Sequence, residues 1–179
     1  MSSPQIAITG FAKRGKTFIE LLLWEMGYDL GNVCAPHGSS NETNIRAFMG
    51  GLELSQLTEH MNDPEALKKI DYPSVIKVPE LAPADIEAIN PTLVIVCMEG
   101  RLASIQNDEV RILEAEYIDS LLENFLKREQ PFIVLPFPYF IRSAAICYAQ
   151  LKSLNLKGQA DFESFASLHA FVEDYTHSM

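Results

Sequence analysis

Short apolar runs alternate along the chain with longer amphipathic segments. Four runs have the length and the β-branched, apolar composition of buried strands, and they cover residues 5–9, 72–78, 92–98 and 131–136. A fifth and weaker run lies at 33–35. The run at 92–98 is the most hydrophobic of the set, so we expect it to be a central strand that is buried on both faces.

The segments between these runs have the spacing of helices. Helices are predicted over residues 17–26, 44–61, 83–89, 109–128, 142–154 and 162–175, with a further short helix that begins at Pro64 behind an Asp63 cap. The clearest is 109–128, where apolar residues recur at steps of three and four. This alternation predicts a three-layer α/β fold, with a parallel sheet of about five strands covered by helices on both faces.

The turn between the first strand and the first helix carries a complete phosphate-loop motif. Residues 10–17 match the Walker A pattern G-x-x-x-x-G-K-T, in which the two glycines allow backbone N–H groups to surround a phosphate. Lys16 is expected to reach the terminal phosphates, and Thr17 to offer its hydroxyl to a metal or a phosphate. The predicted nucleotide-binding residues are Gly10, Phe11, Ala12, Lys13, Arg14, Gly15, Lys16 and Thr17. We therefore predict a single P-loop domain over residues 1–179.

The overall charge narrows the kind of ligand. The 179-residue chain has a formal net charge of −10, which argues against a binding face for a nucleic-acid polymer. Lys13, Arg14 and Lys16 form a local basic cluster on this acidic chain. Such a cluster favours capture of a small anionic nucleotide.

Cysteine usage and hydropathy indicate where in the cell the protein is located. The three cysteines, Cys34, Cys97 and Cys147, are widely separated and lack metal-ligand spacing, which is typical of reduced thiols. No signal peptide is recognisable, and no apolar run approaches the roughly twenty residues that a membrane span needs. A cytoplasmic location without membrane association is expected.

Further candidate residues stand where the predicted strands end, because ligands of parallel sheets bind at the carboxyl ends of the strands. Lys77 lies near the end of one strand and Glu80 follows it, while Glu99 ends the most hydrophobic strand. The long polar loop at 34–44 supplies His37, a candidate for proton transfer. A conventional ATPase or GTPase has an Asp at the end of an apolar strand, and none of these strands ends in Asp. If a metal is bound, Thr17 and Glu99 are its candidate ligands.

Several segments together resemble the P-loop sulfotransferase family. Residues 11–17 resemble its first motif, residues 27–31 resemble a phrase of bacterial members, and residues 76–79 resemble its strand ending in Lys-x-Pro or Lys-x-His. Residues 93–96, followed by Arg101 and Ser104, resemble the strand and turn that bind the 3′-phosphate of the nucleotide, and residues 131–135 resemble the closing segment. Two positions differ from the family pattern: Val96 stands where the family has an Arg, and Pro79 where many members have a His.

The resemblance implies a donor and roles for individual residues. Lys13, Gly15, Lys16 and Thr17 would bind the 5′-phosphosulfate of 3′-phosphoadenosine 5′-phosphosulfate. Lys77 would stabilise the sulfuryl group during transfer, and Arg101 with Ser104 would hold the 3′-phosphate. Sulfuryl transfer needs no metal, which agrees with the strand ends that lack Asp.

Three functions remain open from the sequence. The first is a small sulfotransferase-like enzyme with Lys13, Lys16, Lys77 and His37 as catalytic candidates, Glu42 being another possible base, and a small molecule as acceptor. The second is a nucleotide or small-molecule kinase or NTPase that uses ATP or GTP with Mg²⁺ on Thr17 and Glu99. The third is a non-catalytic nucleotide-binding protein. Neither the acceptor nor the oligomeric state is indicated.

Overall fold

Among the residues that the structure describes, four parallel strands form one sheet. The structure is a computed structural model that describes residues 3–30, 59–78, 80–101, 107–154, 156 and 161–177. The strands are β1 (Ile6–Thr9), β2 (Val75–Lys77), β3 (Leu93–Glu99) and β4 (Phe132–Phe137), and their order across the sheet is β2-β1-β3-β4. The predicted α/β architecture with a parallel sheet is confirmed. The weaker fifth strand expected at 33–35 lies outside the described residues.

Seven helices are described around this sheet. They are α1 (Lys16–Glu25), α4 (Pro64–Leu67), α5 (Pro83–Ile89), α6 (Asp108–Arg128), α7 (Tyr139–Arg142), α8 (Ala144–Lys152) and α9 (Phe162–His177). The predicted helix over 142–154 is wrong in its beginning, because Arg142 ends α7 and Ser143 has extended backbone (φ −144°, ψ 108°). The Ser143 hydroxyl accepts a hydrogen bond from the N–H of Ile146 and so caps α8. The helix predicted over 44–61 lies almost wholly outside the described residues.

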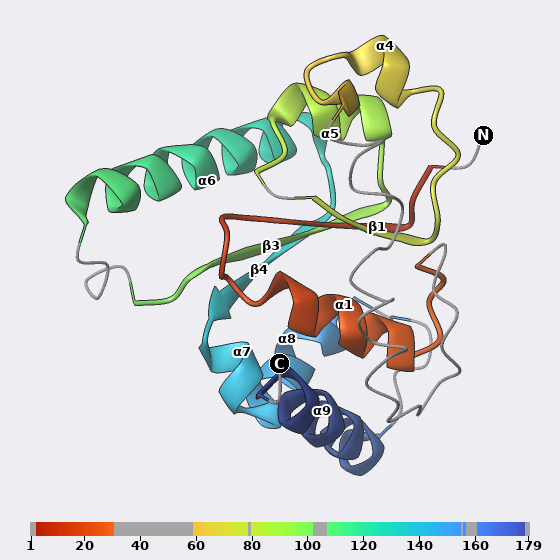
Figure 1. Ribbon diagram of the computed structural model, residues 1–179, viewed down its shortest axis with the longest axis vertical. Coiled ribbons are helices and arrows are strands. Elements are labelled where there is room, and N and C mark those ends of the chain that lie inside the picture. The colour runs from red at the N-terminus through yellow and green to blue at the C-terminus, as the bar shows by residue number, and fades with distance from the viewer. Residues whose placement is uncertain are drawn as a thin grey trace.

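The helices cover both faces of the sheet, as Figure 1 shows. Ile6 and Ile8 of β1 lie in a core with α1, α7, α8 and α9, whereas Ala7 between them lies in a second core with α4, α5 and α6. Side chains of consecutive strand residues point to opposite faces, so a strand covered on both sides must be apolar throughout. In the part of the chain that the structure describes, no helix combines the length and the apolarity needed to cross a membrane.

The connections between the strands reverse direction at the centre of the sheet. From β1 the chain proceeds to β2 on one side, then returns past β1 to β3 and continues outward to β4. Pairing of Ile8 with both Lys77 and Ile95 brings the carboxyl ends of β2, β1 and β3 to one edge. In open α/β sheets, a ligand crevice lies outside the carboxyl ends where the strand order reverses. Here that place is between β1 and β3, where residues 10–15 follow β1.

Candidate functional site

Residues 10–15 connect β1 to α1 by a loop that two glycines make possible. Gly10 has φ 133°, and a Cβ on it would lie 2.0 Å from the carbonyl oxygen of Cys97 in β3. Gly15 caps α1 with φ 74° and ψ 15°, and a Cβ on it would lie 2.8 Å from the ring of Phe140. Real Cβ atoms do not approach other atoms so closely, and both φ values favour glycine. The loop is therefore pressed against β3 on one side and against α7 on the other.

A pocket of about 290 Å³ lies on this loop. We call it the loop pocket, and it is lined by Ala12, Lys13, Arg14, Gly15, Lys16, Thr17 and Lys77. Of the seven lining residues that the structure describes, four are Lys or Arg and none is Asp or Glu. The structure thus brings Lys77 of β2 together with predicted loop residues that lie sixty or more positions earlier in the sequence. Gly10 and Phe11 lie beside the pocket and do not line it.

The side chain of Lys16 is folded back onto its own loop. Its Nζ donates a hydrogen bond of 2.6 Å to the carbonyl oxygen of Gly10 and another to that of Phe11. The residue is 9% exposed, and burial lowers the pKa of its ammonium group. Two carbonyl oxygens compensate part of the hydration that the ammonium has lost. Lys16 therefore fixes the shape of the loop in addition to lining the pocket.

Lys77 is held by a carboxylate that sequence reasoning missed. Its Nζ forms an ion pair with Glu20 of α1 and donates a 3.3 Å hydrogen bond to the Thr17 hydroxyl. Glu20 is 5% exposed, and burial raises the pKa of its carboxyl group while Lys77 opposes this rise. Its signal in the sequence is a single acidic residue inside the apolar run 18–24, three positions after Thr17. This spacing places both side chains on one face of a helix.

Arg14 is held on the opposite side of the loop by α6. Its Nη2 and Nε donate hydrogen bonds of 2.6 Å and 2.9 Å to the carboxylate of Glu114, which is fully buried. The hydrogen bond to Glu114 raises the pKa of Arg14, and Glu114 also accepts a 2.9 Å bond from the backbone N–H of Glu99. Charge-assisted pairs of this bidentate kind are strong and geometrically specific. Glu114 was also missed, since the amphipathic pattern of α6 contains many glutamates.

Glu99, the predicted metal ligand, lies beside a guanidinium group and a backbone donor. Its Oε2 lies 3.8 Å from Arg14 Nη1, and its Oε1 accepts a 3.0 Å hydrogen bond from the backbone N–H of Arg101. Thr17, the other predicted ligand, has the ammonium group of Lys77 beside its hydroxyl. A divalent cation at either residue would face a neighbouring positive charge. As arranged here, neither residue fits a metal ion well, and the described residues contain no other cluster of His, Cys, Asp or Glu suited to one.

The remaining predicted site residues are not part of the loop pocket as described. Arg101 follows β3 and lies beside Glu99, with its Nε 3.9 Å from Glu99 Oε1. Ser104, predicted with it for a 3′-phosphate, and His37, predicted for proton transfer, both lie outside the described residues. Their roles stay predictions.

A buried hydroxyl network supports the base of the loop. The Thr9 hydroxyl lies 2.8 Å from that of Tyr117 in α6 and accepts a 3.0 Å hydrogen bond from the N–H of Leu81. Tyr117 donates in turn to the carbonyl oxygen of Leu81, and its ring packs against that of Phe11 at 5.6 Å between centroids. The end of β1, the segment after β2 and α6 are thereby joined directly beneath the loop.

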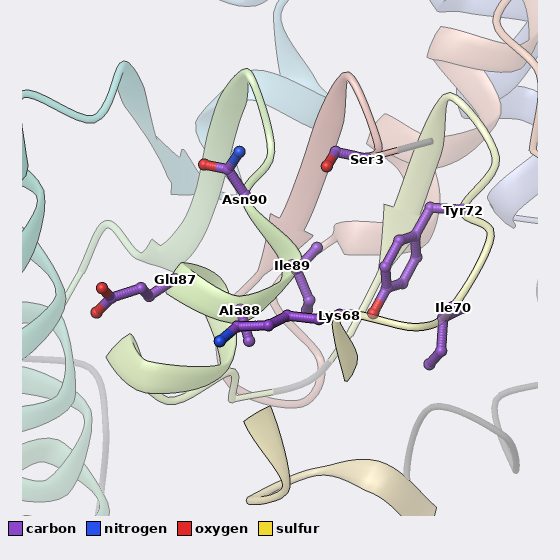
Figure 2. A pocket seen from close by; sticks show the side chains of 8 residues that line it. All are labelled: Ser3, Lys68, Ile70, Tyr72, Glu87, Ala88, Ile89 and Asn90. Carbon is purple, nitrogen blue, oxygen red and sulfur yellow. The ribbon is translucent and has the colours of Figure 1, made fainter. Parts of the chain in front are cut away.

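A second pocket, of about 330 Å³, lies at the opposite edge of the sheet (Figure 2). We call it the amino-edge pocket, and it is lined by Ser3, Lys68, Ile70, Tyr72, Glu87, Ala88, Ile89 and Asn90. Its described lining residues include one cation and one carboxylate, and both have partners: Lys68 pairs with Glu65 at 2.7 Å, and Glu87 lies 3.8 Å from Arg128. Burial raises the pKa of the Tyr72 hydroxyl to about 12, and this hydroxyl donates to the carbonyl oxygen of Leu67.

Comparisons with known proteins find no match to this chain, whether with protein-family models, with curated proteins or with solved structures.

Proposed function

We propose that this chain binds a small nucleotide through its phosphate groups in the loop pocket, as P-loop proteins do. The observation that carries the proposal is the lining of the pocket, where Lys13, Lys16 and Lys77 lie together and no carboxylate is found among the described residues. The ten-residue helix α1 begins at Lys16, so the positive end of its dipole lies at the same place. A volume of about 290 Å³ is near the lower end for small-molecule sites, which suits the phosphate end of a nucleotide.

Among possible reactions, a sulfotransferase-like transfer from a phosphoadenosine-type donor is the one the arrangement favours. Sulfuryl transfer requires positive charge near the transferred group and no metal ion, and Lys16 and Lys77 would supply that charge. Lys77 belongs to β2, whereas the loop follows β1, so two separate elements would present cations to one ligand. A small-molecule acceptor would receive the group, with His37 as the candidate for its proton.

A Mg²⁺-dependent kinase or NTPase is the second candidate, favoured by Thr17 in the pocket lining directly after Lys16. It would use ATP or GTP, with Thr17 and Glu99 near the metal. The cations beside both residues count against it, because each would have to move for a metal ion to bind. A third candidate, a nucleotide-binding protein without catalysis, would use the same pocket.

Calorimetric titration separates these candidates. We expect adenosine 3′,5′-bisphosphate to bind without Mg²⁺, and Lys16→Ala to weaken this binding by about a hundredfold, because a charge-assisted contact is lost. Lys68→Ala, which removes a cation from the amino-edge pocket, is the matched control and should bind as the wild type does. If Lys16→Ala binds as tightly as the wild type, the phosphate site is misplaced. If only ADP binds, and only with Mg²⁺, the kinase replaces the sulfotransferase-like enzyme.

A further inference from the structure

The place beside the Thr17 hydroxyl is taken by a cation that belongs to the protein itself. In nucleotide-triphosphate enzymes with this motif, the Ser or Thr that follows the loop lysine holds Mg²⁺. Here Lys77 Nζ lies 3.3 Å from Thr17 Oγ1 and forms an ion pair with Glu20. The two side chains are 19% and 7% exposed, so this ion pair is largely removed from solvent.

We propose that Lys77, held by Glu20, serves as a built-in cation in place of a metal ion, so that the loop pocket takes its anionic ligand without divalent metal. This inference rests on the proposed function, because it assumes that the loop pocket binds phosphate or sulfate groups. Glu20 is in this view a positioning residue: it acts on the ligand only through Lys77.

Three features of the molecule support the assignment. The first is origin, because Lys77 is the last residue of β2 and Glu20 lies in the second turn of α1, so both come from rigid elements. The second is location, since Lys77 is among the residues that line the pocket and Glu20 is not, so a ligand bound there would contact the lysine and not the carboxylate. The third is exclusion, because a Mg²⁺ ion at Thr17 would stand next to an ammonium group.

The groups around Lys77 include oxygen atoms that could bind a metal ion if the lysine were removed. Magnesium prefers hard oxygen ligands, and it is commonly bound through one or two carboxylates with water or phosphate oxygens. If the ammonium of Lys77 is removed, the carboxylate of Glu20 and the hydroxyl of Thr17 remain beside the pocket. A chain that binds its ligand without metal should then become one in which metal assists binding.

The test is a titration of adenosine 3′,5′-bisphosphate, and of ADP in parallel, into the wild type and Lys77→Met, each with Mg²⁺ and with a chelator. The titrations are run at a pH of about 8, because a high pH favours the ionised form of the buried Glu20 carboxyl, whose pKa burial raises. We expect the wild type to bind equally well in both conditions. Lys77→Met should lose about ten- to a hundredfold in affinity with chelator and recover most of it with Mg²⁺. Lys77→Arg, which keeps a cation, should bind without metal.

The double variant Glu20→Gln/Lys77→Met is the matched control, and it avoids leaving a buried carboxylate without a partner. It should lose affinity as Lys77→Met does and recover none of it with Mg²⁺, because the carboxylate is gone. Wild-type affinity in the double variant would overturn the role of Lys77. Binding by the wild type only with Mg²⁺ would overturn the built-in cation and leave nucleotide binding intact. No binding of either nucleotide by the wild type would overturn the proposed function, and this inference with it.

Discussion

The loop pocket and the amino-edge pocket are similar in volume, at about 290 Å³ and 330 Å³, but their charges are held in different ways. At the amino edge, Lys68 and Glu65 pair with side chains that are 55% and 75% exposed. At the loop, Arg14 and Glu114 pair with side chains that are 13% and 1% exposed. Exposed pairs contribute little because water screens them, whereas breaking a buried pair is costly. The two pockets are therefore alike in volume and differ in how deeply their ion pairs are buried.

The two pockets also differ in how closely their backbone is packed against neighbouring atoms. The loop at the loop pocket contains Gly15, which lines the pocket, and Gly10, which lies beside it, and neither has room for a Cβ. The amino-edge pocket is built on α5 and on the segments that lead into the sheet, and the buried Ile89 is among the residues that line it. Close backbone packing fixes the positions of the loop atoms, as a phosphate-binding loop requires. Three changes test this contrast.

The largest effect is expected from Gly10→Ala. The new Cβ would collide with the carbonyl oxygen of Cys97, a backbone atom in the central strand β3 that cannot move without disrupting the sheet. We expect a loss of about 4 kcal/mol or more in the free energy of unfolding, measured by urea denaturation. Gly27→Ala is the matched control, because Gly27 has φ 92° but no atom within 4 Å of its added Cβ. Its cost should be about 1 kcal/mol. Equal losses in the two variants would show that β1 and β3 do not approach as described.

The next effect concerns the two ion pairs. Glu114→Ala removes the carboxylate that accepts both Arg14 and the N–H of Glu99, leaving a guanidinium in a largely buried place. A loss of about 3 kcal/mol in the free energy of unfolding is expected. Glu65→Ala breaks the exposed pair with Lys68 at the amino edge and should leave stability nearly unchanged. The contrast between the two edges is contradicted if denaturation gives the two variants the same midpoint.

The fold could largely be predicted because its signals are local. The helix expected over 83–89 appears with those bounds, and the strand expected over 92–98 appears as β3, because hydrophobic periodicity and proline position depend on neighbours in the sequence. The break at Ser143 was missed because the apolar pattern continues through it, while the hydroxyl caps a new helix. The candidate loop was predictable for a similar reason, since its motif is contiguous.

The partners of the loop cations could not be predicted in the same way. Glu114 lies 100 positions after Arg14, and Lys77 lies 57 positions after Glu20. The sequence of an amphipathic helix does not distinguish a glutamate that pairs with a distant cation from one that is exposed to solvent. Glu114 became identifiable only from its burial, and burial made the weak sequence signal of Glu20 decisive. Carboxylates are rarely buried, so a buried one is expected to have a partner.

The smallest of the three effects concerns how the stability contributions of Glu20 and Glu65 change with pH, because they should change in opposite directions. Burial raises the pKa of Glu20 in the folded chain, so between its unfolded and folded pKa values the folded state binds more protons. Its contribution to stability is thus greatest at low pH and declines as pH rises through that interval. The ion pair with Lys68 lowers the pKa of Glu65, which gives stability that is present above the unfolded pKa and is lost as pH falls through the folded one. The measurement is the free energy of unfolding from urea denaturation at a series of pH values, for the wild type minus each variant. For Glu20→Gln this difference should fall with increasing pH above the unfolded carboxyl pKa. For Glu65→Gln it should rise slightly with increasing pH below that pKa. If the difference for Glu20→Gln rises with pH instead, the attraction of Glu20 to Lys77 outweighs the effect of burial. The carboxylates at the two edges would then have pH dependences of the same sign that differ only in magnitude.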